Sequence, residues 1–178
     1  MREGFAEFLK ELTAALGGAP KLIAGKADPF RAFLLALETH PGALNILLID
    51  SEGPDDGKRF ESICQPRGID DWARGHVFWM VQCMEAWFLA DAEALRKYYG
   101  KEFREHAFPV NPRVEEISKK DVFEALKAAT KGTSKGPYHK TKHAPSLLKL
   151  IRPALVKQAS EHCRRLFESV PKLAQPAV

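Results

Sequence analysis

The sequence predicts an α/β fold, in which a small parallel or mixed sheet is flanked by helices and followed by a helical C-terminal portion. Several segments repeat apolar residues at the 3.6-residue helical period, and these alternate with short, nearly continuous apolar runs. Such runs are typical of strands that are buried on both faces, as in parallel sheets. The 178 residues are 45% hydrophobic and 28% charged, which excludes a disordered or low-complexity chain.

We expect a single domain over residues 1–178, with the sheet portion in residues 1–100 and a helical, basic portion in residues 101–178. The first portion is expected to contain a helix at 3–16, strands at 21–25, 43–50 and 76–82, a helix at 28–40, a polar loop at 51–75, and helices at 83–90 and 92–99. The second portion is expected to contain a helix at 119–130, a loop at 131–145, and helices at 146–151 and 153–170. Asp28, Asp91 and Ser118 are the predicted N-caps.

Charge is unevenly distributed along the chain. Residues 1–90 carry a net charge of −4 and residues 91–178 a net charge of +8. Eight lysines and arginines and no acidic residue occur between residues 125 and 160. This asymmetry suits an acidic metal site beside a basic cradle for a polyanion. Charge alone favours the plainer interpretation, two solvated surfaces of opposite sign.

Acidic residues follow the most strand-like segment of the chain. Asp50 and Glu52 come at the end of the 43–50 run, and ligands of open α/β sheets bind beyond the carboxyl ends of strands. Two carboxylates at this spacing are candidate ligands for Mg²⁺ or Mn²⁺, because hard cations prefer oxygen ligands. The plainer interpretation is a turn where the strand meets water.

Glu85 is an acid within an otherwise apolar element, Gln82–Leu89. Glutamate is rarely buried unless it is paired or bound to a metal. If the two predicted strands are parallel, Glu85 lies at the same sheet edge as Asp50. The alternative is an ordinary glutamate on the polar stripe of a helix, near the N-terminal end.

A basic segment supplies the candidate contacts to nucleic acid. Lysines bind phosphate as point charges, and aromatic or imidazole rings stack on bases. The candidates are Lys131, Lys135, Tyr138, His139, Lys140, Lys142 and His143. A solvated, flexible loop is the other interpretation of this segment. His139 and His143 are spaced for a metal only if the segment is helical, which Gly136 and Pro145 argue against.

Several other classes of protein are excluded or disfavoured by simple features of the sequence. There is no phosphate-binding Gly-x-x-x-x-Gly-Lys-Ser/Thr loop and no Gly-x-Ser-x-Gly elbow. No apolar run is long enough to span a bilayer, and the first residues lack the apolar core of a signal peptide. Three cysteines without metal-ligand spacing favour a cytoplasmic location.

Two segments resemble an uncharacterised bacterial family, domain of unknown function 4276. They are Ile46–Glu52 and His76–Asp91, and the similarity continues through Lys120–Val122, Lys135–Lys140 and Arg164–Leu166. The family is similar to Toprim-like nucleases, some of which are encoded beside ATPases in phage-defence loci. The resemblance implies a parallel sheet whose strand ends carry acids that bind Mg²⁺.

The resemblance assigns Asp50 and Glu52 to the acidic pair after a central strand and Glu85 to the acid of a Glu-x-Trp-Leu-Leu-like block. Family members begin with a strand that ends in Glu-Gly, whereas this sequence begins in the helix that follows that strand. We therefore expect either an upstream start or a truncated copy that lacks one carboxylate and an inner strand.

Three functions remain as hypotheses at this stage. The first is a Mg²⁺-dependent nuclease in which Asp50 and Glu52 hold the metal, Glu85 acts as a further ligand or base, and the basic segment binds RNA or DNA. The second is a non-catalytic partner or regulator of an ATPase. The third is a nucleic-acid-binding module without chemistry.

Overall fold

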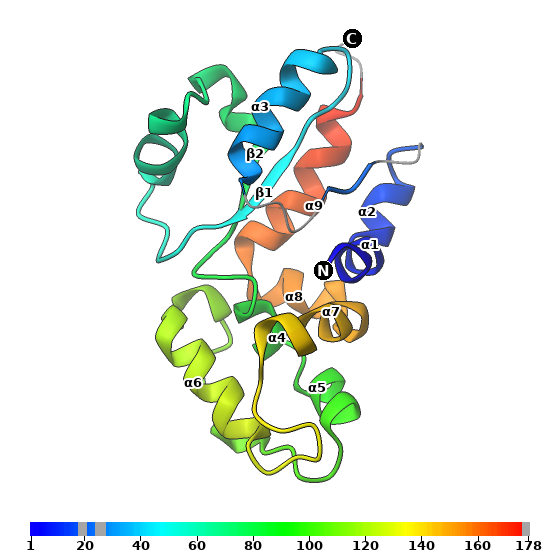
Figure 1. Ribbon diagram of the computed structural model, residues 1–178, viewed down its shortest axis with the longest axis vertical. Helices are drawn as coiled ribbons and strands as arrows, with labels where there is room; N and C mark the ends of the chain where they lie inside the picture. Colours follow the sequence, from blue (N-terminus) through cyan, green and yellow to red (C-terminus); the bar gives the residue numbers. More distant parts are fainter. Residues whose placement is uncertain (18–20, 24–27, 176–178) are drawn as a thin grey trace.

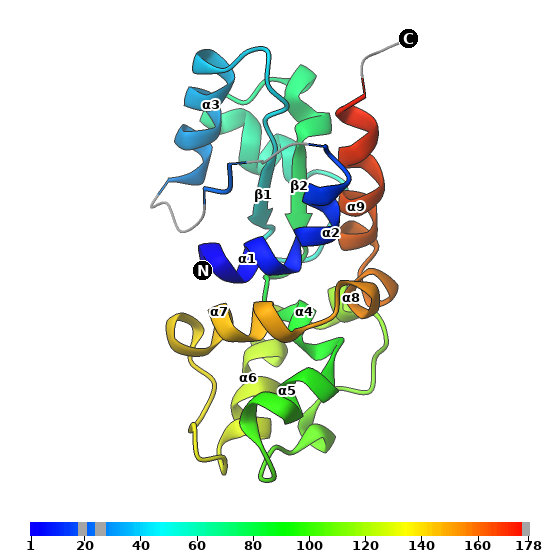
Figure 2. The same cartoon turned by 90° about the vertical axis from the view of Figure 1, so that its right-hand side faces the viewer.

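The computed structural model describes residues 1–17, 21–23 and 28–175 of the chain, and its sheet consists of two parallel strands. Strand β1 is Leu47–Asp50 and strand β2 is Val77–Met80, with Leu47 opposite Val77 and Asp50 opposite Met80. Both strands end at the same edge, above the lower group of helices (Figure 2). Both are shorter than predicted, because the flanking apolar residues make no ladder with a partner strand.

Helices cover the two strands. Helix α3 (Pro29–Thr39) packs against β1 and helix α9 (Glu161–Leu173) packs against β2 (Figure 1). The Asp28 side chain caps α3 by accepting a hydrogen bond from the Arg31 amide at 3.0 Å, as predicted. Helix α9, near the C-terminal end of the chain, thus packs on a sheet whose two strands both lie within residues 1–100.

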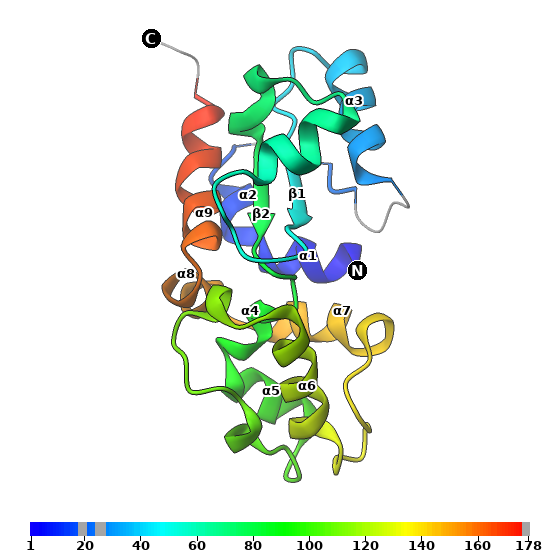
Figure 3. The same ribbon diagram turned by 90° about the vertical axis from the view of Figure 1, so that its left-hand side faces the viewer.

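A second group of helices lies beyond the carboxyl edge of the strands (Figures 2 and 3). It comprises α4 (Ala86–Leu89), α5 (Ala92–Tyr99), α6 (Lys119–Thr130), α7 (Lys140–Leu150) and α8 (Pro153–Ala159). Trp87, Leu95, Leu126 and Leu147 are fully buried among these helices. A smaller apolar cluster, around Phe33, Ile49 and Phe60, lies on the α3 side of the sheet.

The predicted N-terminal helix is interrupted. Helices α1 (Arg2–Phe8) and α2 (Lys10–Ala14) meet at Leu9, whose φ of −91° and ψ of 9° leave the helical geometry. The break lets α1 pack on α7 while α2 packs on α9. Gly4 is required for the first contact, because a Cβ there would lie 2.7 Å from the Pro145 carbonyl oxygen.

Three further sequence predictions are corrected. Residues 21–23 do not form a strand, and the rest of the predicted strand lies outside the described residues. The segment 51–75 is not one loop, because short helical turns at 60–64, 65–67 and 71–76 bury Phe60, Cys64 and Ile69. The predicted helix 153–170 is two helices, since Ser160 ends α8 and caps α9.

The predicted loop 131–145 ends earlier than expected. Helix α7 begins at Lys140 and contains Pro145. His143, Ala144, Leu147 and Leu148 are buried along this helix, and this packing outweighs the proline penalty on which the sequence prediction rested. None of the helices in the described ranges has both the length and the apolar character needed to cross a bilayer.

The Asp91 carboxylate joins α5 to the segment before α8, and we expect its removal to destabilise the fold. Its side chain is fully buried; it caps α5 through the Ala94 amide and accepts three hydrogen bonds from Arg152 at 2.7–2.9 Å. Asp91→Ala should lower the free energy of unfolding by about 3 kcal/mol. Glu93→Ala removes an exposed partner of the same arginine and should cost below about 1 kcal/mol. Urea unfolding of both variants measures the difference, and equal losses would contradict this assignment.

Candidate functional site

Two acids and one lysine meet at the carboxyl end of the sheet. Asp50 is the last residue of β1, Glu85 directly precedes α4, and Lys140 is the first residue of α7. The Lys140 Nζ lies 3.5 Å from Asp50 Oδ2 and 3.4 Å from both carboxylate oxygens of Glu85. The parallel register brings Asp50 and Glu85 to the same edge of the sheet, as expected, and both contact the Lys140 ammonium there.

Each carboxylate in this cluster has a second, fixed contact. Asp50 Oδ1 accepts a hydrogen bond from the Met84 amide at 2.8 Å, and Glu85 Oε1 accepts one from the Tyr138 hydroxyl at 3.0 Å. These contacts orient the carboxylates so that Asp50 Oδ2 and Glu85 Oε2 remain for a cation. Residues from three separate segments thus build one site.

Burial and charge act against one another in this cluster. The Glu85 side chain is fully buried, the Asp50 side chain is 17% exposed, and the Lys140 side chain is 45% exposed. Burial raises the pKa of Asp50. The Lys140 ammonium and the hydrogen bond from the Met84 amide lower that pKa by less, so it lies above its ordinary value. Burial would lower the pKa of Lys140, but attraction to Glu85 and Asp50 outweighs it and raises that pKa. Lys140 is therefore held as an ammonium ion.

The chain leaves both strands through an unusual backbone conformation. Glu52 and Gln82 each lie two residues beyond a strand end, and they have φ values of 59° and 65°. Residues other than glycine rarely adopt this region, and such strain is concentrated at functional sites. Buried Ser51 links the two exits, because its hydroxyl accepts a hydrogen bond from the Gln82 amide at 2.9 Å and donates one to the Gly53 carbonyl.

Glu52 does not share a cation with Asp50 in this structure. Its side chain is exposed, and its carboxylate pairs with Lys119 at the start of α6. The reversal of the backbone at Glu52 accounts for the separate partners. The acid that converges with Asp50 in this structure is Glu85, and Glu52 as a second metal ligand stays a prediction. Across the described residues, no group of three or more histidine, cysteine, aspartate or glutamate side chains is arranged to hold a metal ion.

The basic segment is divided between the surface and the core. Tyr138 and His143 are 4% and 2% exposed, so neither ring is available to nucleic acid. Tyr138 packs in the core with its hydroxyl on Glu85, and the His143 Nδ1 contacts the Tyr99 hydroxyl at 2.9 Å. His143 belongs to the buried stripe of α7, which the loop prediction missed, and Tyr138 lies two residues before this helix. The exposed members of the segment are Lys131, Lys135, His139, Lys140 and Lys142.

His139 and His143 are on one helix turn but do not form a metal site. His139 is the N-cap residue of α7, and its amide donates a hydrogen bond to the His143 Nδ1 at 3.2 Å. Burial lowers the pKa of His143, with a smaller contribution from Lys142. His143 is therefore a neutral core residue of the helix.

A second charged cluster holds the segment that follows β1, and sequence reasoning missed it. His162 in the first turn of α9 has its Nδ1 3.1 Å from Glu115 Oε2 and its Nε2 3.0 Å from Asp55 Oδ2. Hydrogen bonding to Glu115 raises the pKa of His162, against the effect of burial. Asp55 and Glu115 are far from His162 in the sequence, so no local pattern indicates that they contact it.

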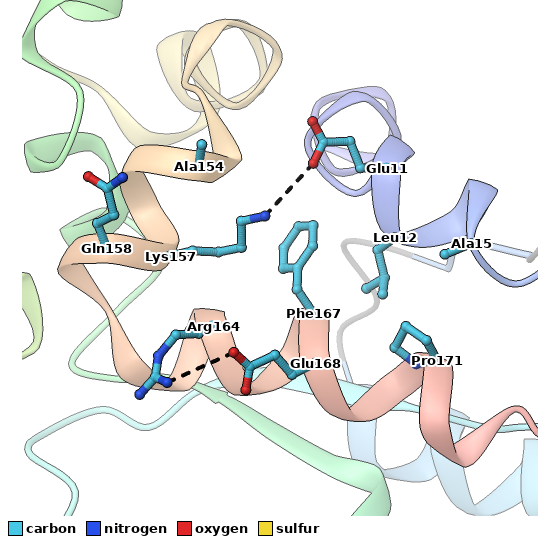
Figure 4. Close-up of a pocket in the computed structure, with 10 residues that line it drawn as sticks. All are labelled: Glu11, Leu12, Ala15, Ala154, Lys157, Gln158, Arg164, Phe167, Glu168 and Pro171. Atoms are coloured by element: carbon cyan, nitrogen blue, oxygen red, sulfur yellow. Dashed lines mark ion pairs between the residues drawn. The ribbon is translucent and has the colours of Figure 1, made fainter.

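A surface hollow lies away from both charged clusters. Its volume is about 680 Å³, and α2, α8 and α9 form its walls around Leu12 and Phe167 (Figure 4). The ion pair between Lys157 on α8 and Glu11 on α2 crosses it, and the pair between Arg164 and Glu168 lies along α9 at its wall. It contains none of the predicted site residues.

Comparison with known proteins gave one match. Residues 6–170 match the family model described as Domain of unknown function (DUF4276). Searches of curated proteins and of solved structures found no match. The match covers both strands and every residue of the two clusters.

The His162 cluster makes the stability of the fold depend on pH. Since the pKa of His162 is raised above 6.5 in the folded state, its stabilising contribution is complete below about pH 6.5 and is lost as pH rises through the folded value. Thermal unfolding measured between about pH 5 and pH 9 covers the titration of histidine. We expect His162→Gln to be less stable than wild type at the low end of this range. The deficit should shrink at high pH. A deficit that is independent of pH would contradict this role, and His106→Gln, at an exposed histidine, is the control.

Proposed function

This chain belongs to the family Domain of unknown function (DUF4276), and we propose that it is a metal-dependent phosphodiesterase that cleaves nucleic acid. The observation that carries the proposal is the convergence of Asp50 and Glu85 on one cationic group at the carboxyl end of the parallel strands. This edge is where α/β sheets bind ligands. A fully buried glutamate is costly to keep, which supports a role beyond folding.

The donor set fits one divalent cation. Asp50 Oδ2 and Glu85 Oε2 already share a single positive charge, and their other oxygens are held by Met84 and Tyr138. Mg²⁺ is commonly held by one or two carboxylates together with waters and substrate phosphates. Bound there, Mg²⁺ or Mn²⁺ would polarise a phosphoryl oxygen and lower the pKa of a bound water.

Other residues of the chain would orient the two carboxylates and bind the phosphates of the substrate. The Met84 amide and the Tyr138 hydroxyl keep the two carboxylates in fixed positions. Lys140 is half exposed on a long flexible side chain, so its ammonium group can turn from the carboxylates to a phosphate oxygen. Lys131, Lys135, His139 and Lys142 lie exposed in the same segment and would hold the rest of a polyanion.

A second candidate function follows from the same contacts. Lys140 already neutralises the charge that a cation would neutralise. A member of the family that kept this ion pair permanently would be a non-catalytic partner or regulator, of an ATPase for example, or a nucleic-acid-binding module. This candidate predicts no metal-dependent cleavage and no sensitivity to Asp50→Asn.

Cleavage of labelled single-stranded and double-stranded RNA and DNA tests the proposal directly. We expect cleavage in Mg²⁺ or Mn²⁺, none in EDTA, and a loss of at least about a hundredfold in Asp50→Asn or Glu85→Gln. Asp56→Asn is the matched control, because Asp56 is exposed and belongs to the same acidic stretch. Activity that persists in Asp50→Asn would reject this site, and absence of cleavage under every condition would favour the second candidate.

A further inference from the structure

A smaller pocket lies beside the sheet, between β2, the segment after β1 and the first turns of α9. Its volume is about 160 Å³, below the usual range for sites that hold a whole nucleoside-sized ligand. Its charged lining residues are Asp55, Arg59, Arg74, His162 and Arg165. A small pocket with three arginines in its walls has the composition of a site for a compact anion.

Arg59 is fixed in this pocket by its own loop. Its Nε donates a hydrogen bond to the Pro54 carbonyl at 2.8 Å. Its Nη2 lies against Gly53, where a Cβ would come within 2.5 Å and would displace the guanidinium group. In the part of the chain that the structure describes, no carboxylate lies within ion-pair distance of Arg59. Its guanidinium is thus oriented but not neutralised.

Arg165 enters the pocket from the opposite wall. It lies one helical turn after His162, on the same face of α9. The neighbouring Arg164 lines the other hollow instead, where it pairs with Glu168 (Figure 4). Among the described residues, Arg165 has no acidic partner within ion-pair distance.

The other charges of the pocket are already compensated. Arg74 pairs with Glu61 at 2.7 Å and with Asp71 at 2.8 Å. His162 is held between Asp55 and Glu115. Two guanidinium groups from separate segments therefore remain to neutralise a ligand, which must carry negative charge.

We propose that this pocket binds a phosphate group through Arg59 and Arg165. The planar fork of donors on arginine matches the oxygens of a phosphate. The source of the phosphate rests on the proposed function: in a nuclease, it is a phosphate of the nucleic acid chain. The loop that carries Arg59 is the one that leaves β1 at Asp50.

Binding of a fluorescently labelled single-stranded oligonucleotide, measured in EDTA, tests the pocket without any cleavage. Arg59→Ala and Arg165→Ala should each weaken binding about tenfold. Each should also reduce the slope of log affinity against log salt by about one. The matched controls Lys58→Ala and Arg164→Ala remove the same charge from the adjacent residues and should change affinity little.

Equal weakening by all four variants would mean diffuse electrostatic attraction and would overturn the proposal. Unchanged oligonucleotide binding in all four would overturn it if the double variant described below also binds inorganic phosphate as wild type does. Circular dichroism and thermal unfolding verify that the variants fold. Arg165 is exposed, so its variant decides the outcome if Arg59→Ala disturbs the loop. Arg59→Lys keeps the charge without the fork and should recover binding only in part.

Inorganic phosphate distinguishes the two sources of the ligand. Calorimetric titration with phosphate alone should show binding to wild type that the Arg59→Ala/Arg165→Ala double variant loses. If phosphate binding is lost while oligonucleotide binding is unchanged, the pocket is confirmed and free phosphate is its ligand. If oligonucleotide binding is lost as well, the nucleic acid is the source. Failure of the Asp50→Asn cleavage test would leave both binding results intact, so the two proposals fail separately.

Discussion

A fully buried carboxylate at Glu85 is the constraint on which the site depends. Removing such a charge from water is costly, and the structure offsets this cost with the Lys140 ammonium and the Tyr138 hydroxyl. These partners come from the segment 138–140, far along the chain from Glu85. Helix α7 must therefore begin at Lys140 and lie across the end of the sheet, and α1 in turn packs on α7. The partners of this one acid thus tie the start of α7 to the end of the sheet.

The segment after β1 links the features described above. It leaves Asp50 through buried Ser51 and the left-handed backbone at Glu52, and Asp55 then ties it to His162 on α9. These contacts hold an acidic loop in a defined position beside the sheet. The loop carries Arg59 into the small pocket, while β1 carries Asp50 to the edge of the sheet where it meets Lys140. A phosphate site and a carboxylate site on one strand and its loop are suited to handling a charged chain.

Local signals in the sequence predicted much of this fold, and long-range contacts account for the remainder. The cap at Asp28 and the buried runs at the two strands are determined by neighbouring residues, so they could be predicted. The burial of Glu85 was also indicated by its apolar neighbours. Its partner Lys140 could not be found, because no local pattern indicates which cation 55 residues away will meet a buried acid. The helical conformation of Pro145 likewise depends on tertiary packing.

The central claim is that Asp50 and Glu85 form a cation site in which Lys140 supplies the charge in the absence of a metal. Calorimetric titration of Mn²⁺ into wild type, Lys140→Met and Lys140→Met/Asp50→Asn tests it most directly. The account predicts that Lys140→Met binds Mn²⁺ at least about tenfold more tightly than wild type, because the competing charge is gone. The added Asp50→Asn change should abolish that gain. Equal affinity in wild type and Lys140→Met, or tight binding that survives Asp50→Asn, would contradict the claim.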